Sequence, residues 1–190
     1  MTNSLRERQA PLKARYEAEP GSAKLTFTIR SGTVGNDPTR VRVQTDAGDV
    51  NPLGVWDVGA HPMAGGDGEL ACSGDLLLGS LAACQEITLR MVAAAMGIAL
   101  ESVEVVVEGD LDFRGTMGVD LDTPVGFTAI RTNIRIEADA PEDRLERLAQ
   151  RAERFCVVAA TLRESPKLTT VIETAQSRAT PASSKARDNT

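Results

Sequence analysis

The longest apolar segment of this 190-residue chain, residues 74–96, constrains its fold more than any other feature. Its sequence is GDLLLGSLAACQEITLRMVAAAM, with Gln85, Glu86 and Arg90 near the middle. A charge at the centre of a membrane span costs about 3 kcal/mol, whereas each leucine returns only about 0.5 kcal/mol. The segment is therefore predicted to be a central helix of a soluble domain, apolar on most of its sides.

The ends of the segment carry helix signals. Ser73 is the expected N-cap, Asp75 faces the positive end of the helix dipole, and Gly97 is the expected stop. Because such a helix is apolar almost all round, a single sheet of the same chain cannot cover it. A second copy of the protein is expected to supply the missing cover, which predicts an obligate homodimer.

The rest of the chain predicts an α+β fold with antiparallel sheets. Several segments alternate apolar and polar residues, as strands with one solvated face do. Residues 141–156 carry an apolar stripe after a proline and are predicted to be a helix. The expected strands are residues 25–32, 39–45, 50–58, 102–115, 129–138 and 167–173, with a glycine-rich loop at 61–69. Strands, a long helix, more strands, a helix and a strand favour α+β over alternating βαβ units.

The chain is expected to have three parts. Residues 1–20 are charged and predict a short N-terminal helical arm, and residues 21–175 are long enough for one domain with its own core. Residues 176–190 are rich in Ser and Ala and are predicted to be a disordered tail.

Composition excludes several classes of protein. A net charge of −6 argues against nucleic-acid binding, which needs clustered Lys and Arg. Three cysteines are too few for a disulfide scaffold, and one histidine without a C-x-x-C motif argues against zinc. The polar N-terminal segment lacks an apolar signal core. We therefore expect a cytoplasmic protein without metal, cofactor or membrane contact.

Two cysteines lie on helix faces that are predicted to point inward. Cys84 lies in the central helix, and Cys156 lies on the same stripe as Leu145 in the later helix. A free cysteine is most often a small buried hydrophobe. The same placement suits a redox pair, and the residues alone leave both interpretations open.

Three motifs in the same order resemble the OsmC family, the osmotically inducible and organic hydroperoxide resistance proteins. They are CSGDLLLGSLAAC (72–84), EGDLDFRG (108–115) and ERFCVVAATL (153–162), within a resemblance that covers about residues 60–175. The resemblance implies an intertwined homodimer with long helices packed between sheets. It also implies a thiol peroxidase with Cys84 as the peroxidatic and Cys156 as the resolving cysteine. A small hydroperoxide would be the substrate and an external dithiol, such as a lipoyl group, the reductant.

This chemistry depends on the thiolate form of Cys84. With an ordinary pKa near 8.5, about 3% of the thiol is ionised at pH 7, compared with about 90% at a pKa of 6. Lowering the pKa of the thiol from 8.5 to 6 corresponds to a free energy of roughly 3.4 kcal/mol. A guanidinium about 4 Å away supplies about 4 kcal/mol at an effective dielectric constant near 20. The resemblance implies an arginine of the early hairpin in this role, with Arg42 preferred over Arg40.

Two positions depart from the family pattern. Asp75 stands where the family often has a glutamate that orients the arginine, and nine helical residues place it about 13.5 Å from Cys84 on the opposite side. The family commonly has Cys-Pro-Val where this chain has Cys156, Val157 and Val158. Asp75 therefore either caps the helix, reaches a bridging arginine or serves the neighbouring protomer.

Other functions stay open at this stage. Cys72 precedes the helix, where backbone N–H groups can activate a thiol or where it merely packs under a loop. His61 either lines the mouth of the site or is solvated. The alternative to a peroxidase is a non-catalytic OsmC-like dimer that binds a small apolar ligand or partner. A purely structural module with ordinary core cysteines is the third interpretation.

Overall fold

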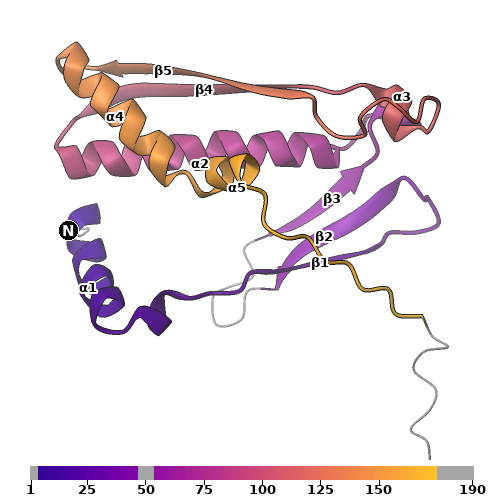
Figure 1. The fold of residues 1–190 in the computed structure, drawn as a ribbon, viewed down its shortest axis with the longest axis horizontal. Coiled ribbons are helices and arrows are strands. Elements are labelled where there is room, and N and C mark those ends of the chain that lie inside the picture. Colours follow the sequence, from indigo (N-terminus) through magenta and orange to yellow (C-terminus); the bar gives the residue numbers. More distant parts are fainter. Residues whose placement is uncertain (1–3, 47–53, 175–190) are drawn as a thin grey trace, which may run out of the picture.

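Helix α2 (Ser73–Met96) is the central element of the computed structural model, which describes residues 4–46 and 54–174 (Figure 1). The sequence predicted this helix, and its stop is confirmed, since Gly97 has a φ of 66° in the left-handed region. The N-cap is Cys72, one residue before the expected Ser73. The Asp75 carboxylate accepts a hydrogen bond of 2.8 Å from the backbone N–H of Cys72 and so closes the first turn.

The N-terminal part forms a helix and a three-stranded antiparallel sheet. The predicted arm contains α1 (Leu5–Ala18), which buries none of its residues and is followed by the turn η1 (Pro20–Ala23). The predicted hairpin is confirmed as β1 (Thr28–Thr33) and β2 (Arg40–Asp46). Strand β3 (Val55–Gly59) pairs with β2, while residues 50–53 of that predicted strand lie outside the described ranges. The turn η2 (Pro62–Ala64) lies in the glycine-rich loop before α2.

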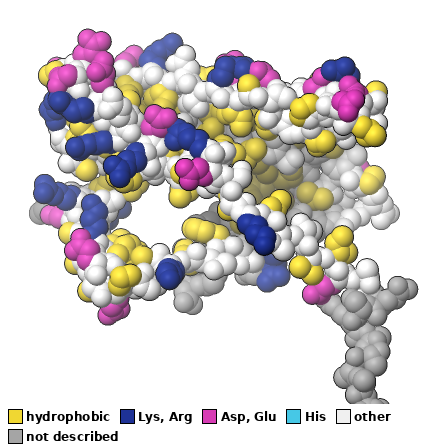
Figure 2. All heavy atoms as spheres, in the orientation of Figure 1, with side chains coloured by type: hydrophobic (Ala, Val, Ile, Leu, Met, Phe, Trp, Pro, Cys, Tyr) yellow, Lys and Arg dark blue, Asp and Glu magenta, His cyan; other side chains and the backbone are white. Residues whose placement is uncertain are grey.

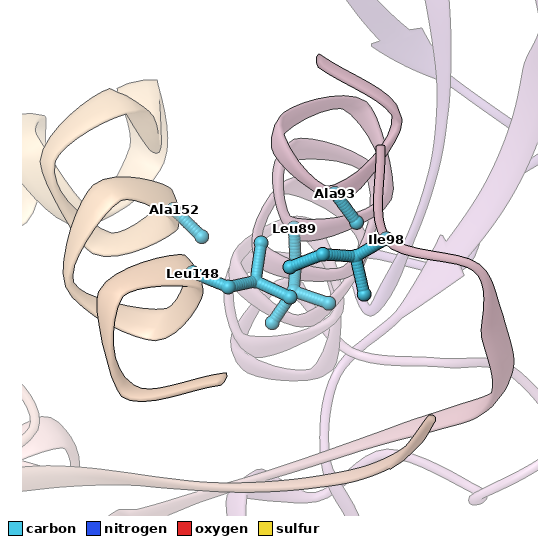
Figure 3. Packing of buried hydrophobic residues seen from close by; sticks show 5 residues of the cluster. All are labelled: Leu89, Ala93, Ile98, Leu148 and Ala152. Carbon is cyan, nitrogen blue, oxygen red and sulfur yellow. The ribbon is translucent and has the colours of Figure 1, made fainter. Parts of the chain in front are cut away.

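The C-terminal part builds the core on one side of α2. Strands β4 (Leu100–Asp110) and β5 (Ala129–Ala138) form an antiparallel pair, and α4 (Glu142–Phe155) packs against α2 before the short α5 (Val157–Arg163). Burial alternates along β5, as predicted. In Figure 3 the core side chains of α2 and α4 meet, and Leu89 and Leu148 are both 0% exposed. The other members of this buried cluster are Ala93, Ile98 and Ala152.

The two parts of the chain are covered to very different extents. In Figure 1 the β4–β5 pair lies on one side of α2, and the sheet of β1, β2 and β3 lies on the other. Figure 2 shows an open gap between the N-terminal part and the layers above it, with hydrophobic side chains around the recess. Among the described residues, large apolar side chains such as those of Phe27 and Ile87 stay exposed, at 85% and 57%.

Two strand predictions were wrong. Strand β4 ends at Asp110, and the predicted continuation to residue 115 instead forms α3 (Phe113–Thr116). The cause is local, because the Asp112 carboxylate accepts a hydrogen bond of 3.0 Å from the Arg114 N–H and caps that turn. Residues 167–173 are exposed and belong to no sheet of the described chain.

The α+β class and the long helix packed on antiparallel strands are confirmed. Among the described residues, α2 is the one helix long and apolar enough to cross a membrane, a test that core helices also pass. Within the chain it contacts β4, α4 and α5. The homodimer and the division into arm, domain and tail remain predictions, and the tail lies outside the described ranges.

Candidate active site

Cys84 belongs to α2, and Cys156 lies beside it at the break that separates α4 from α5. Cys84 is half-buried in the middle of α2, and Cys156 is 0% exposed. They share one apolar cluster with Leu81, Val107, Ile130, Val158 and Ala159. The expectation that both cysteines face inward is therefore confirmed. All three cysteines of the chain are free thiols in this structure.

The break at Cys156 positions the second thiol. The residue has an extended backbone, with φ −74° and ψ 108°, so α4 ends before it and α5 starts after it. The chain starts this new helix although Val157 replaces the proline common in the family. The Cys156 sulfur accepts a hydrogen bond of 3.4 Å from the backbone N–H of Ala159 and serves as the N-cap of α5.

The surroundings of Cys84 favour its anion. Burial is the largest single influence and by itself raises the pKa of the thiol. Four polar groups oppose it: the backbone N–H of Val158, the thiol of Cys156, the N–H of Val157 and the hydroxyl of Thr88. Together they outweigh burial, and the pKa of Cys84 lies below the ordinary value of a cysteine. The thiolate is the reactive form of a cysteine, and a lowered pKa raises its share.

The pKa of Cys156 moves in the opposite direction. Burial raises it most, and the N–H of Ala159 opposes this only in part. The neighbouring Cys84 raises the pKa of Cys156 further, because the Cys156 proton bonds to the Cys84 anion. The pKa values of the two neighbouring thiols are therefore shifted in opposite directions, and the lower one belongs to Cys84.

The arginines preferred for activation lie in the N-terminal sheet and are engaged by carboxylates. Arg42 forms two hydrogen bonds of 2.7 and 2.9 Å with Asp57, its neighbour across β2 and β3. Arg40 binds Asp67 and also Glu69 at 2.6 Å in the glycine-rich loop. No guanidinium of the described residues is among the leading influences on the Cys84 pKa. Activation by Arg42 or Arg40 stays a prediction.

Asp75 acts at the start of α2. The backbone N–H of Cys72 is the main reason why the Asp75 pKa is lowered, and the Cys72 side chain contributes next. These contacts show that Asp75 caps the helix. Its assistance to an arginine or to a neighbouring protomer stays a prediction.

Cys72 and His61 have structural partners near the same helix start. Cys72 is the N-cap residue of α2, twelve positions before Cys84 along the chain. His61 stacks on Phe113 with ring centroids 5.0 Å apart, and its Nδ1 accepts a hydrogen bond of 3.1 Å from the Met63 N–H. Within residues 4–46 and 54–174, no three His, Cys, Asp or Glu side chains gather as metal ligands do.

Sequence reasoning missed the groups that stabilise the Cys84 anion. Thr88 lies four residues after Cys84, a spacing that brings two side chains to the same helix face, so it was detectable from the sequence. The N–H groups of Val157 and Val158 carry no such signal, because every residue except proline has one. They reach Cys84 only because the chain breaks at Cys156.

Comparisons with known proteins show the family and the fold. The family model of the OsmC-like proteins matches residues 66–171, which contain both thiols. An OsmC-like protein from Mycoplasma pneumoniae is 18% identical, with a TM-score of 0.60 over 75% of this chain and 90% of that one. An organic hydroperoxide resistance protein from Legionella pneumophila is 23% identical, with a TM-score of 0.56 over 75% and 92%. Another from Elizabethkingia anophelis, solved with thiocyanate bound, is 14% identical, with a TM-score of 0.58 over 75% and 91%.

No curated protein matches this chain significantly by sequence. At these identities the solved structures show the fold, whereas the family match spans more than half of the chain. The chain belongs to the family of OsmC-like proteins.

Proposed function

We propose that the protein is a thiol peroxidase that reduces organic hydroperoxides, with Cys84 as the peroxidatic and Cys156 as the resolving cysteine. One observation supports this above the others: two packed thiols whose pKa values are shifted in opposite directions. A nucleophile needs the lowered pKa, and a resolving thiol can stay protonated until a sulfenic acid forms beside it.

The reaction follows from the two thiols. The Cys84 thiolate attacks the terminal oxygen of ROOH, an S–O bond forms, the O–O bond breaks, and the alkoxide leaves and is protonated to ROH. The Cys156 sulfur then attacks the sulfenic acid of Cys84, so that a disulfide forms and water leaves with the Cys156 proton. An external dithiol reduces the disulfide by exchange and is itself oxidised to a disulfide. This cycle needs a reducing compartment, in agreement with the proposed cytoplasmic location.

The apolar walls around the thiols favour organic over inorganic peroxide. Leu81 is 4% exposed, and Val107 and Ile130 are half-buried against the same cluster. An alkyl or aryl group gains from contact with such side chains, whereas hydrogen peroxide has no apolar part to bury. Organic hydroperoxide resistance is also the activity named for the solved structures from Legionella pneumophila and Elizabethkingia anophelis.

We further propose that the protein acts as a homodimer through the free face of α2. Ile87 is 57% exposed and Met91 39%, although both lie in the most apolar segment of the chain. Only 17% of the apolar window of α2 is buried within the chain. Exposed apolar residues spaced by three, four or seven positions share this face, as the residues of helix interfaces do: Leu76, Ala83, Ile87, Met91 and Ala94.

A non-catalytic binding role is the second candidate. It is favoured by the ion pairs that hold Arg40 and Arg42 at the carboxylates of the N-terminal sheet. Without a cation, the Cys84 anion depends on hydrogen bonds alone. A Cys84 pKa at the ordinary value, measured by pH-dependent alkylation, would favour the binding role over the peroxidase.

The test combines mass spectrometry with a coupled assay. One equivalent of cumene hydroperoxide is expected to link Cys84 to Cys156, and Cys84→Ser is expected to abolish peroxide consumption with dithiothreitol as reductant. Cys72→Ser is the matched control, because Cys72 caps α2 away from the pair, and its activity is expected to stay close to that of the parent protein. Retained activity in Cys84→Ser, or a link that involves Cys72 instead, rejects the proposal.

A further inference from the structure

A groove lies between α1, α2 and α4, beside the site of the two thiols. Its volume of about 390 Å³ falls within the range of about 300–1,000 Å³ that is typical of small-molecule sites. In Figure 1, α1 lies next to the half of α2 that follows Cys84, and α4 crosses the same half. The groove is open to solvent, so a ligand bound there can keep a charged group hydrated.

The floor of the groove is apolar. Val92, Ala95 and Met96 come from one face of α2, because residues three and four positions apart share a helix face. Phe155 adds an aromatic ring from α4, and it is 63% exposed although it is one of the largest apolar side chains of the chain. An aliphatic chain gains from contact with such a floor, whereas a small hydrophilic ion does not.

Two cations line the groove above this floor. Lys13 comes from α1 and Arg151 from α4, and in the described part of the chain neither is joined to a carboxylate. By contrast, Arg147 of the same helix α4 is paired with Asp143. Figure 2 shows Lys and Arg side chains gathered over α1 and α4. In a protein with a net charge of −6, two unpaired cations at one apolar groove favour an anion locally.

One end of the groove adjoins the polar groups around Cys84. Thr88 lines the groove, and its hydroxyl is one of the groups that lower the Cys84 pKa. Phe155 directly precedes Cys156 in the chain. Neither sulfur lines the groove itself, so the groove is a neighbour of the thiol site and not a part of it.

The groove also differs from the proposed dimer face of α2. Of the residues of that face, Met91 lines the groove, whereas Leu76, Ala83, Ile87 and Ala94 do not. The homodimer proposed above therefore does not need the floor of this groove.

We propose that this groove binds an aliphatic carboxylate, with its charged head at Lys13 and Arg151 and its chain on the apolar floor. A guanidinium can donate two parallel hydrogen bonds to a carboxylate, and the ammonium adds a second positive charge. The chain explains why the cations lie at an apolar surface, and the head explains why they have no carboxylate of their own. The inference goes beyond the proposed peroxidase and does not depend on it.

The first test compares three probes by isothermal titration calorimetry at low ionic strength. Octanoate carries both the head and the chain, 1-octanol only the chain and acetate only the head. Octanoate is expected to bind several-fold more tightly than 1-octanol, and acetate is expected not to bind measurably. Because the two cations are exposed, high salt should remove the advantage of octanoate and leave 1-octanol unaffected. Equal affinities for octanoate and 1-octanol overturn the proposal.

The second test changes the groove. Lys13→Gln and Arg151→Gln are each expected to weaken octanoate about two- to fivefold, the range of an exposed ion pair, without a change for 1-octanol. Arg8→Gln is the matched control, because Arg8 is an exposed cation of α1 that does not line the groove, and it should bind octanoate like the parent protein. Ala95→Trp fills the floor and should abolish binding of both probes. Unchanged octanoate binding in both charge variants places the anion elsewhere and overturns the proposal.

A second copy of the chain is the other possible occupant. If the parent protein binds no octanoate and Ala95→Trp converts a dimer into a monomer by light scattering, the groove is an interface between copies and the proposal is overturned. The probes contain no peroxide, so these results hold whether or not the protein consumes hydroperoxide. Failure of this inference and failure of the proposed function are thus separate outcomes.

Discussion

The two parts of this chain differ in how complete they are without a partner. In the C-terminal part, burial alternates along β5, and Leu89 and Leu148 are fully enclosed between α2 and α4. In the N-terminal part, every residue of β1 is exposed, and Phe27 just before it is 85% exposed. In the same sheet, Val58 of β3 is 5% exposed. Strand β1 is therefore the strand of this sheet that lacks cover within residues 4–46 and 54–174.

The same division separates the candidate chemical groups. Cys84 and Cys156 lie in the C-terminal part, where the chain has its own core. Arg40 and Arg42 lie in the N-terminal sheet, where they bind carboxylates. The C-terminal part can thus lower the pKa of Cys84 by itself, and any contribution of an arginine depends on how the N-terminal sheet is placed in an assembly.

The largest effect on stability is expected from Leu148→Ala. Its side chain is 0% exposed and packs in the cluster with Leu89, so truncation leaves a cavity and should lower the free energy of unfolding by about 2–5 kcal/mol. Leu12→Ala in α1, which is 42% exposed, should cost no more than about 0.5 kcal/mol. Urea unfolding measures both. Equal losses would show that α1 is as well packed as the core and would remove the contrast between the two parts.

Disruption of the α2 face is expected to have the next largest effect. Ile87→Arg places a charge in the middle of the exposed apolar face, where burial against a second copy would leave it without a partner. Light scattering should show a dimer for the parent protein and a monomer for this variant at micromolar concentration. Gln150→Arg, on the exposed side of α4, is the control and should remain a dimer. A dimer that survives Ile87→Arg would place the interface elsewhere.

The fold could be predicted where the signal is local. The periodicity of residues 74–96 and 129–138 identified α2 and β5 with bounds within one residue of those observed. The end of β4 could not be predicted, because the alternating pattern continues past Asp110 while Asp112 caps a turn instead. Residues 167–173 have the composition of a strand, but pairing depends on a neighbour that composition does not reveal.

A smaller effect is expected at the junction between α4 and α5. Val157→Pro removes one of the N–H groups that lower the Cys84 pKa, and proline is tolerated at the first position of a helix. The Cys84 pKa should rise, so the pH at which alkylation accelerates should move upward and the rate at pH 7 should fall several-fold. Iodoacetamide labelling followed by mass spectrometry measures the profile. Val157→Ala keeps the N–H and should preserve the parent profile, and an unchanged profile in Val157→Pro would show that this N–H does not act on the sulfur.

The candidate site could be predicted only in part. The apolar stripes of two helices placed Cys84 and Cys156 inward, and the structure brings them together. The sequence reasoning assigned the stabilisation of the thiolate to a guanidinium, because a mid-helix cysteine is far from the N-terminus of its own helix. It did not foresee that the N-terminal N–H groups of another helix reach the sulfur, since the break at Cys156 is a property of the folded chain.

The smallest effect on stability is expected from Arg42→Gln. This variant also tests most directly whether the two parts of the chain act separately. The Arg42–Asp57 pair is solvent-exposed, so its loss should barely move the unfolding midpoint, while the pKa of Asp57 should rise because its main hydrogen-bond donor is gone. In the monomeric Ile87→Arg background, Cys84 alkylation should keep its pH profile, since the thiolate there depends on Thr88 and the N–H groups of α5. In the dimer, a profile moved to higher pH would assign the activating guanidinium to the assembled N-terminal sheet. A profile that moves in the monomer as well would show that Arg42 reaches Cys84 within one chain, and the two parts would then no longer act separately.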